Sequence, residues 1–314
     1  MAKRKTKSSK NRLKMIKYGM WILAVSIFAL IFLIVGYYFG YLDAKQKFQQ
    51  SKSVERYHVD TSYKRAIKKS KRYISASHEY ADESLAKPPK PFARKVVKTS
   101  TKPKLAIIID DVSLATQVRK IKSIGIPLTL SFFPPKSTRP NSAKLASHER
   151  VYMVHLPMEA YNFTAEEPLT LRVKDSQKII THRIKEIKRL FPRVRYINNH
   201  TGSKFTANET AVNRLILALK NEHINFIDSR TTAETKVPKV MKNYGFRYVA
   251  RDVFLDDDTD MNEIVFQMKR AVKLAKLHGS AIAIGHPHPN TIKALKKYKK
   301  LFNDVKLVKI NEIY

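Results

Sequence analysis

From Lys104 onward, short apolar runs alternate with longer amphipathic stretches. The apolar runs are rich in Val, Ile and Phe, which is typical of buried strands. They predict strands at 105–110, 128–133, 151–155, 194–198, 224–228, 247–251, 280–285 and 305–308. Apolar residues at three- and four-residue spacing behind an Asp or Asn predict helices over 175–191, 208–222 and 261–278. Because strands and helices alternate, we expect an α/β fold.

A different pattern precedes this region. Residues 18–41 form one uncharged apolar run, long enough to cross about 30 Å of hydrocarbon at about 1.5 Å per residue. The segment 1–17 carries eight Lys or Arg and no acid. This asymmetry predicts a single-pass helix in the cytoplasmic membrane, with the N-terminus in the cytoplasm and the rest of the chain outside. Interfacial aromatic residues lie near the ends of the run: Trp21, Tyr37, Tyr38 and Tyr41.

A cleaved signal peptide has a similar layout. The apolar run is longer than a usual signal-peptide core, and no clear A-x-A site follows it, so we favour an uncleaved anchor. Residues 42–103 are polar and basic, with a cluster over 64–72 and a Pro-bearing run over 87–91. They predict a partly helical stalk that ends in an extended linker, and we interpret the cluster as a solvated spacer.

Charge narrows the classes of partner. The chain has 61 Lys and Arg against 26 Asp and Glu, a net charge of +35, and the first 103 residues hold 24 basic and six acidic residues. Such a balance suits nucleic acid, anionic lipid or acidic polymers. We expect no specific nucleic-acid binding, because no recognition motif accompanies the lysines and the domain would lie outside the membrane. The absence of cysteine excludes disulfides, a thiolate nucleophile and Cys-ligated zinc.

Polar residues that can bind a metal or move a proton follow six of the predicted strands. These groups are Asp110 with Asp111, His155 with Glu159, residues 198–202, Asp228 with Arg230, Arg251 with Asp252, and His286 with His288. The C-terminal ends of parallel strands share one face, where the sites of α/β proteins are built. One such residue alone is explained better by a helix cap or a structural ion pair than by function. Six groups together predict a site.

The residue types fit metal-assisted hydrolysis. A divalent ion held by imidazole and carboxylate ligands lowers the pKa of bound water to about 7 and polarises a carbonyl. A neighbouring carboxylate then takes the proton, and a protonated His or an Arg stabilises the developing charge or the leaving group. The sequence contains no G-x-S-x-G elbow and no Gly-rich nucleotide loop.

Six motifs in this order carry a family resemblance: Ile-Ile-Ile-Asp-Asp, His-Leu-Pro-Met-Glu, Asn-Asn-His-Thr-Gly-Ser, Phe-Ile-Asp-Ser-Arg-Thr, Arg-Asp-Val-Phe-Leu-Asp and Ala-Ile-Gly-His-Pro-His-Pro. With them, residues 104–314 resemble the divergent polysaccharide deacetylase family, a distant relative of the NodB-type carbohydrate esterases. The resemblance implies a distorted (β/α)7 barrel that removes N-acetyl groups from a polysaccharide.

The resemblance also implies roles for single residues. In the NodB pattern an Asp-Asp pair supplies the base and then a metal ligand, which implies Asp110 as base and Asp111 as ligand. The second motif of that pattern is H-x-x-x-H, and here His155 and Glu159 match it, so the second imidazole is missing. Either Glu159 is an oxygen ligand or His200 completes the site. We prefer Asp111, His155 and His200, with Glu159 as a fourth ligand or a supporting group.

The remaining roles follow from the same resemblance and from position at a strand end. His286 corresponds to the general-acid histidine, while the usual R-x-P-Y motif is absent. Further site residues are expected in catalysis, Arg251 and Asp252, and in substrate binding, Asn199, Asp228, Arg230 and His288.

Carboxylate and imidazole ligands suit Zn, Co, Ni or Mn, and we expect Zn. The expected partner is an envelope polysaccharide such as peptidoglycan or another acetylated glycan. The alternative function is a non-catalytic envelope protein that keeps the deacetylase fold as a glycan-binding or scaffold module. The missing H-x-x-x-H motif is the reason for keeping that alternative.

Overall fold

The computed structural model describes Met20, residues 102–163 and residues 165–314. The predicted cytoplasmic segment, the predicted transmembrane helix except Met20, and nearly all of the predicted linker lie outside these residues. Among the residues that the structure does describe, no helix has both the length and the apolar character that crossing a membrane requires.

One parallel sheet organises the described domain. Its order is β5-β4-β3-β2-β1-β7-β6, and β8 pairs with the first residues of β1. The strands are β1 (Lys104–Val112), β2 (Thr129–Phe132), β3 (Tyr152–Met158), β4 (Tyr196–Thr201), β5 (Asn225–Ile227), β6 (Val253–Phe254), β7 (Ser280–Gly285) and β8 (Lys306–Val308). All the pairings between these strands are parallel, so the predicted α/β fold is confirmed.

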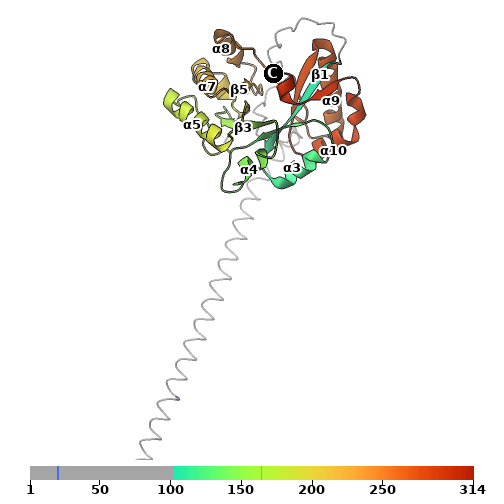
Figure 1. Ribbon diagram of the computed structural model, residues 1–314, viewed down its shortest axis with the longest axis horizontal. Helices are drawn as coiled ribbons and strands as arrows, with labels where there is room; N and C mark the ends of the chain where they lie inside the picture. The colour runs from blue at the N-terminus through green and yellow to red at the C-terminus, as the bar shows by residue number, and fades with distance from the viewer. Residues whose placement is uncertain (1–19, 21–101, 164) are drawn as a thin grey trace, which may run out of the picture. The chain divides into compact units, whose positions relative to one another are not determined.

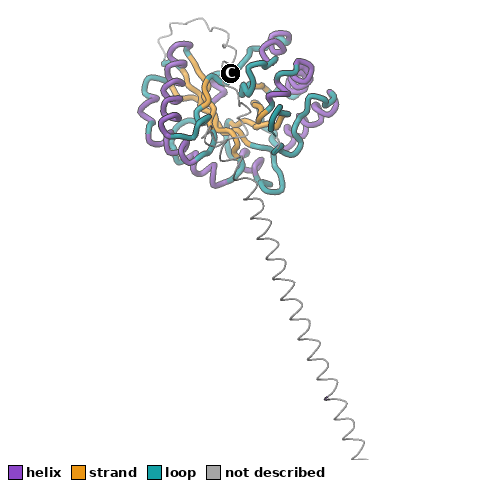
Figure 2. The backbone as a smooth tube through the Cα atoms, turned by 180° about the vertical axis from the view of Figure 1, so that it is seen from behind, coloured by secondary structure: helices purple, strands orange, loops and turns teal. Residues whose placement is uncertain are grey.

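Helices lie around the outside of this sheet (Figures 1 and 2). The α-helices are α3 (Ala115–Lys122), α4 (Ser142–Ala146), α5 (Gln177–Leu190), α6 (Ser203–Thr206), α7 (Glu209–Asn221), α8 (Val237–Asn243), α9 (Met261–His278) and α10 (Pro289–Lys297). Two short 3₁₀ helices, η2 (Lys299–Phe302) and η3 (Ile310–Glu312), lie near the C-terminus. The three predicted helices correspond to α5, α7 and α9.

The starts of these three helices follow from local chemistry. The side chains of Ser176, Asn208 and Asp260 accept hydrogen bonds from backbone N–H groups in the first turns of α5, α7 and α9. Such N-caps satisfy donors that have no partner within the helix. Helix α9 ends at Gly279, whose φ of 77° is a left-handed conformation that glycine adopts without a steric penalty.

The sheet is curled, so that its two edges meet. The Asp228 N–H donates to the Val249 carbonyl, and the Arg251 N–H donates to the Asp228 carbonyl, both at 3.0 Å. These bonds form one parallel bridge between Asp228, just after β5, and Ala250, just before β6. The bridge brings together the two ends of the strand order.

The predicted strand at 247–251 is wrong. This segment pairs only through the single bridge at Ala250, and the strand lies two residues further on, as β6. The alternation of side chains in this segment comes from their burial and hydrogen bonding. The Val249 side chain packs into the interior of the sheet, while the Tyr248 hydroxyl donates to Asp228 Oδ2 at 3.0 Å. Because β6 ends at Phe254, the residues that follow this strand differ from those predicted.

The sheet separates two hydrophobic cores. On β1, Leu105, Ile107 and Ile109 pack outward against the helices, whereas Ala106 and Ile108 face an inner core. This is the two-residue alternation of strand side chains. The inner core ends at η3 and the residues after it, where Ile310 and Ile313 are buried. Apolar side chains therefore fill the N-terminal end of the curled sheet, and polar groups are left for the C-terminal end.

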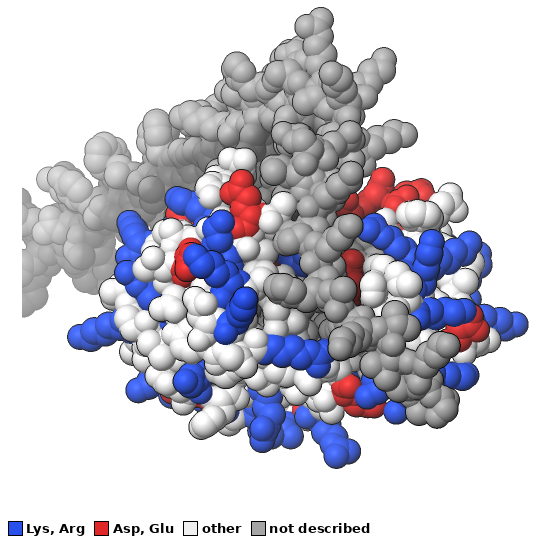
Figure 3. All heavy atoms as spheres, turned by 90° about the horizontal axis from the view of Figure 1, so that it is seen from above, with Lys and Arg blue, Asp and Glu red and all other residues white. Residues whose placement is uncertain are grey.

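Basic side chains are distributed widely over the domain. On the face in Figure 3, Lys and Arg side chains are spread over much of the part drawn in colour, and Asp and Glu form fewer groups. Several acidic residues of the domain form ion pairs, such as Glu167 with Lys136 and Arg139.

Candidate active site

The inner side chains of four strands change from apolar to polar toward their C-terminal ends. On β1 the series is Ala106, Ile108 and Asp110, and on β7 the residues Ile282 and Ile284 precede His286. On β3 and β4 the inner positions become His155, Asn198 and His200, all of them buried. Because strand side chains alternate, each polar residue lies on the same face as the apolar residues before it. The polar groups therefore converge above the inner core.

Asp111 joins this group through a backbone irregularity. Consecutive residues of a regular strand point to opposite faces. Between Ile109 and Val112 the register with β2 shifts, and Asp111 has a φ of 56°, a left-handed value that Asp tolerates better than most residues. The bulge turns the Asp111 side chain toward the imidazoles on β3 and β4, so both members of the Asp-Asp pair serve one site.

A second local device follows His200. Thr201 and Gly202 have φ values of 50° and 94°, and the chain turns at once into α6. A Cβ on Gly202 would lie 2.9 Å from the Cβ of Met158, closer than side chains approach one another. Glycine is therefore needed for the turn that ends β4 directly after His200.

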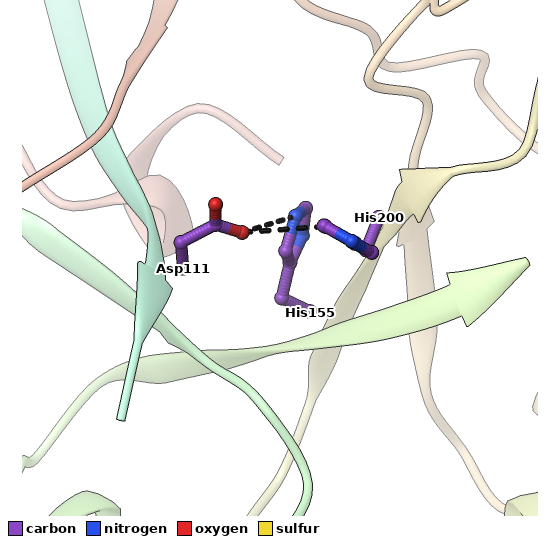
Figure 4. Close-up of side chains that lie close together, drawn as sticks. All are labelled: Asp111, His155 and His200. Carbon is purple, nitrogen blue, oxygen red and sulfur yellow. Dashed lines mark ion pairs between the residues drawn. The ribbon is translucent and has the colours of Figure 1, made fainter. Parts of the chain in front are cut away.

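Asp111, His155 and His200 form a compact cluster of possible metal ligands (Figure 4). Asp111 Oδ1 lies 3.3 Å from His155 Nε2 and 3.2 Å from His200 Nδ1. All three atoms are buried, and none makes a hydrogen bond with the described residues. Three buried atoms with lone pairs that face a common point are the donor set of a divalent metal site. The residues present thus fit such an ion.

The pKa values of the three possible ligands are coupled. Burial lowers the pKa of His155, but Asp110 and Asp111 outweigh it and raise this pKa. Burial raises the pKa of Asp111, but His155 and His200 outweigh it and hold this pKa well below its usual range. Burial lowers the pKa of His200, and Asp111 offsets this only in part. A deprotonated carboxylate and a neutral imidazole are the forms that bind a metal.

Asp110 lies beside the cluster and is almost fully buried. Its Oδ2 accepts a hydrogen bond from Asn198 Nδ2 at 2.8 Å and lies 3.6 Å from His155 Nδ1. Burial raises the pKa of this carboxyl, although His155 and His286 lower it in part. Asp110 Oδ1 has no hydrogen-bond partner among the described residues, so one oxygen of this carboxylate is available to an incoming molecule.

His286 is held by Asp256. The His286 Nδ1 lies 3.0 Å from Asp256 Oδ1, and the His286 N–H donates to Asp256 Oδ2 at 2.7 Å. Thr291 Oγ1 donates to the same Oδ2 at 2.6 Å. Burial lowers the pKa of His286, but Asp256 outweighs it and raises the pKa to about 9. His286 is therefore a buried imidazole that carries its proton at neutral pH.

Aromatic side chains border the two imidazoles of the cluster. The Phe133 ring lies 4.6 Å from the His200 ring and 5.4 Å from the His155 ring, between centroids. The Arg139 guanidinium lies 4.2 Å above Phe133, and Phe163 meets His200 at 6.3 Å. Packing of this kind limits the rotation of the imidazoles and excludes water from one side.

Glu159 does not join the cluster. Its Oε1 accepts a hydrogen bond from Lys204 at 2.7 Å, and its Oε2 accepts one from the Val173 N–H at 2.8 Å. Burial raises the pKa of Glu159, but Lys204 and the Val173 N–H outweigh it and lower the pKa. Both oxygens thus serve the loop after β3, and neither is among the three atoms of the cluster. The role of Glu159 as a fourth ligand or a supporting group stays a prediction, and His200 is the second imidazole beside Asp111.

Asn199 and Asp228 also serve the fold. Both are fully buried. Asn199 donates to the Thr201 carbonyl and accepts from the Ser229 N–H. Asp228 accepts from the Arg230 N–H, from Tyr248 and from Thr235. Their polar atoms are thus engaged by protein groups, and the substrate contacts expected of these two residues stay predictions.

Arg230, Arg251 and Asp252 lie where the sheet edges meet. The Arg230 guanidinium donates to the Arg251 carbonyl, and that of Arg251 donates to the Ser229 and Arg230 carbonyls. Asp252 Oδ2 accepts from the Ile282 N–H at 2.8 Å. These contacts support the backbone, and the substrate role expected of Arg230 and the catalytic roles expected of Arg251 and Asp252 stay predictions. His288 lies beside His286, with ring centroids 5.6 Å apart.

Two site residues, Asn198 and Asp256, were given no role from the sequence, although each had a signal there. Asn198 is two positions before His200, so the two share a face of β4, whereas Asn199 lies on the other face. Asp256 is the last residue of the motif Arg-Asp-Val-Phe-Leu-Asp, and it follows the true strand β6. The misplaced strand at 247–251 had pointed to Arg251 and Asp252 instead.

Comparisons with known proteins agree with this fold. Residues 107–314 match the model of a family described as divergent polysaccharide deacetylase. An uncharacterized protein of Haemophilus influenzae is 34% identical over 220 residues, which cover 67% of this chain and 76% of that protein. The uncharacterized protein YibQ of Escherichia coli is 34% identical over 215 residues, 67% of each chain.

A solved structure shows the same fold. The uncharacterized protein ATU2773 from Agrobacterium tumefaciens has a TM-score of 0.60 at 19% identity, with 71% of this chain and 93% of that one covered.

Proposed function

This chain belongs to the divergent polysaccharide deacetylase family, and on that premise we propose that it is a metal-dependent hydrolase of N-acetyl groups on an envelope polysaccharide. One observation carries the proposal. Three buried ligand atoms without hydrogen bonds, on Asp111, His155 and His200, face a common point beside the buried carboxylate of Asp110.

Asp111, His155 and His200 would hold the ion, which we propose to be Zn²⁺. Two imidazoles and one carboxylate are a frequent ligand set of hydrolytic zinc sites, and a fourth position stays open for the reaction. When bound, a divalent ion supplies Lewis acidity, which makes water more acidic and polarises the carbonyl group of the substrate. The irregular backbone at Asp111 is the device that lets this carboxylate reach both imidazoles.

The protein residues around the site would move the protons. Hydrolysis joins the oxygen of water to the acetyl carbon and breaks the carbon–nitrogen bond, which releases acetate and a free amine. Asp110 would take a proton from the attacking water, and this role is supported by its Oδ1, which makes no hydrogen bond to the described residues. His286 would donate a proton to the leaving amine, and Asp256 keeps it oriented for this step.

The proposal also covers the substrate and the location of the protein. The family suggests a polysaccharide, and the predicted anchor over 18–41 would place the domain outside the cytoplasmic membrane, facing peptidoglycan or another acetylated glycan. His288 lies next to His286 and would contact the sugar at the leaving nitrogen. Extraction tests the anchor. The full chain should stay with the membrane in high salt and alkaline carbonate, whereas release by either treatment would contradict it.

Acetate release tests the hydrolase. We expect the full chain, purified in mild detergent without chelator, to contain about one metal ion and to release acetate from acetylated glycans such as purified peptidoglycan. Asp110→Asn should keep the metal and lose turnover by about 100-fold or more, since general-base catalysis contributes about 10²–10⁴-fold. Asp111→Ala should lose both.

Asp304→Asn, the same change at an exposed carboxylate that pairs with Lys276, is the matched control and should keep both properties. A folded parent that binds no metal and releases no acetate would refute the proposal. If such a parent still sedimented with purified cell wall, a glycan-binding module would be the better description.

A further inference from the structure

Asn198 lies at the centre of the buried polar network, and its side chain is 0% exposed. Its Nδ2 donates to Asp110 Oδ2 at 2.8 Å and to Ser229 Oγ at 3.0 Å. Its Oδ1 accepts from Ser131 Oγ at 2.7 Å and lies 3.2 Å from His155 Nδ1. One amide thus contacts side chains from β1, β2, β3 and the segment after β5.

The chemistry of these partners fixes the direction of the amide. An ionised carboxylate only accepts hydrogen bonds, so the NH₂ end of Asn198 must face Asp110. The carbonyl end must then face His155, and His155 Nδ1 must carry the hydrogen that this carbonyl accepts. The other ring nitrogen, Nε2, is left with its lone pair, and it is the atom that faces Asp111 Oδ1.

We propose that Asn198 is the positioning residue that couples the two halves of the site. Through its carbonyl it selects the form of His155 whose Nε2 can bind a metal, and through its NH₂ group it fixes the carboxylate of Asp110 beside that metal. This inference rests on the proposed metal site and adds to it a residue that touches neither the metal nor the substrate. Partners of this kind, behind the ligands of a metal, typically change affinity by about 10–100-fold when removed.

The two ends of the amide can be tested separately. Asn198→Asp keeps an oxygen for His155 Nδ1 but replaces the donor to Asp110 with a second carboxylate. Asn198→Ala removes both ends. Asn208→Ala is the matched control, because Asn208 caps α7 through the Ala211 N–H and has no role in the site. It should lower the stability of the fold modestly, as lost caps do.

The experiment measures Zn²⁺ affinity of the detergent-purified full chain by competition with a chromophoric chelator, together with the visible spectrum of the Co²⁺ form and acetate release. We expect Asn198→Ala to bind Zn²⁺ about 10–100-fold more weakly and to show an altered Co²⁺ spectrum. Asn198→Asp should bind Zn²⁺ within about threefold of the parent, since the acceptor for His155 stays, yet lose turnover. Asn208→Ala should match the parent in all three measurements.

The outcomes separate this inference from the proposed function. A parent that binds no Zn²⁺ would overturn the metal site and this role together. A parent that binds Zn²⁺ tightly, beside a folded Asn198→Ala with the same affinity and Co²⁺ spectrum, would overturn the role of Asn198 alone. If Asn198→Ala does not fold, Asn198→Asp decides, because a fall of more than tenfold in its Zn²⁺ affinity would contradict the contact to His155.

Discussion

Two clusters at the C-terminal end of the sheet contain the same residue types, one Asp and two His each. They are Asp111 with His155 and His200, and Asp256 with His286 and His288, and in both clusters the possible ligand atoms lie within 4.8 Å of one another. They differ in how the carboxylate is bonded. Asp111 Oδ1 makes no hydrogen bond among the described residues, whereas both oxygens of Asp256 accept hydrogen bonds from fixed donors.

The difference separates a ligand from an orienting group. A carboxylate whose oxygens are already saturated cannot also bind a metal without losing those bonds, so Asp256 serves to orient and charge His286. The buried Asp111 carboxylate can be stabilised in two ways, by ion pairs with protonated imidazoles or by a cation bound between the three groups. By residue composition alone, both clusters would be candidate metal sites. The hydrogen bonds to Asp256 distinguish them, because they engage the carboxylate of the second cluster.

The largest expected effect is on metal content. His200→Ala removes one of three ligands from the first cluster, and we expect Zn²⁺ affinity to fall by more than about 100-fold, beyond the loss caused by a partner behind the ligands. His288→Ala is the matched change in the second cluster and should leave the metal content of the purified chain as in the parent. Mass spectrometry of metal content measures both. Loss of metal in His288→Ala but not in His200→Ala would mean that the second cluster, and not the first, binds the metal.

The next effect concerns the proton on His286. Its pKa is about 9 in the folded chain against an ordinary 6.5, because Asp256 outweighs burial. A raised pKa contributes stability that is full below about pH 6.5 and is lost as the pH rises through about 9. At about 1.4 kcal/mol per pKa unit, this contribution is about 3 kcal/mol.

Asp256→Asn removes the charge that raises this pKa. We therefore expect urea unfolding in the presence of chelator to show a decline between pH 6.5 and 9.5 in the parent and a much flatter profile in the variant. Asp304→Asn, at an exposed carboxylate paired with Lys276, should keep the parental slope. A variant profile as steep as that of the parent would mean that Asp256 does not hold the proton on His286.

Much of the fold could be predicted from the sequence, because it depends on local periodicity. Seven of the eight predicted strands coincide with observed strands, and the apolar spacing of α5, α7 and α9 marks their buried faces. The exception is the segment 247–251. Its buried and polar side chains alternate as in a strand, but this alternation comes from burial and not from strand pairing. Its backbone pairs at one position only, and periodicity does not distinguish a buried bridge from a strand.

The site was partly predictable for the same reason. The placement of Asp110, Asp111, His155, His200 and His286 follows from strand ends that share a face. The bond between Asp256 and His286 joins residues 30 positions apart across β6 and β7, and their register is fixed by tertiary packing. Asn198 could have been selected from the sequence in place of Asn199. Side chains alternate along a strand, so Asn198 lies on the same face as His200 and Asn199 lies on the other face.

The smallest expected effect tests the residue that the H-x-x-x-H pattern aligned with the metal. Glu159→Gln keeps an acceptor for the Val173 N–H and removes the charge that faces Lys204, a side chain 42% exposed. Since exposed ion pairs contribute about 0–1 kcal/mol, we expect urea unfolding to shift by less than about 1 kcal/mol and the Zn²⁺ affinity to stay within about threefold of the parent. A ligand carboxylate would behave otherwise, because an amide oxygen is a weaker donor to Zn²⁺ and the affinity would fall well beyond threefold. A large loss of affinity with little loss of stability would restore Glu159 to the metal and displace His200 from the role that its position beside Asp111 supports.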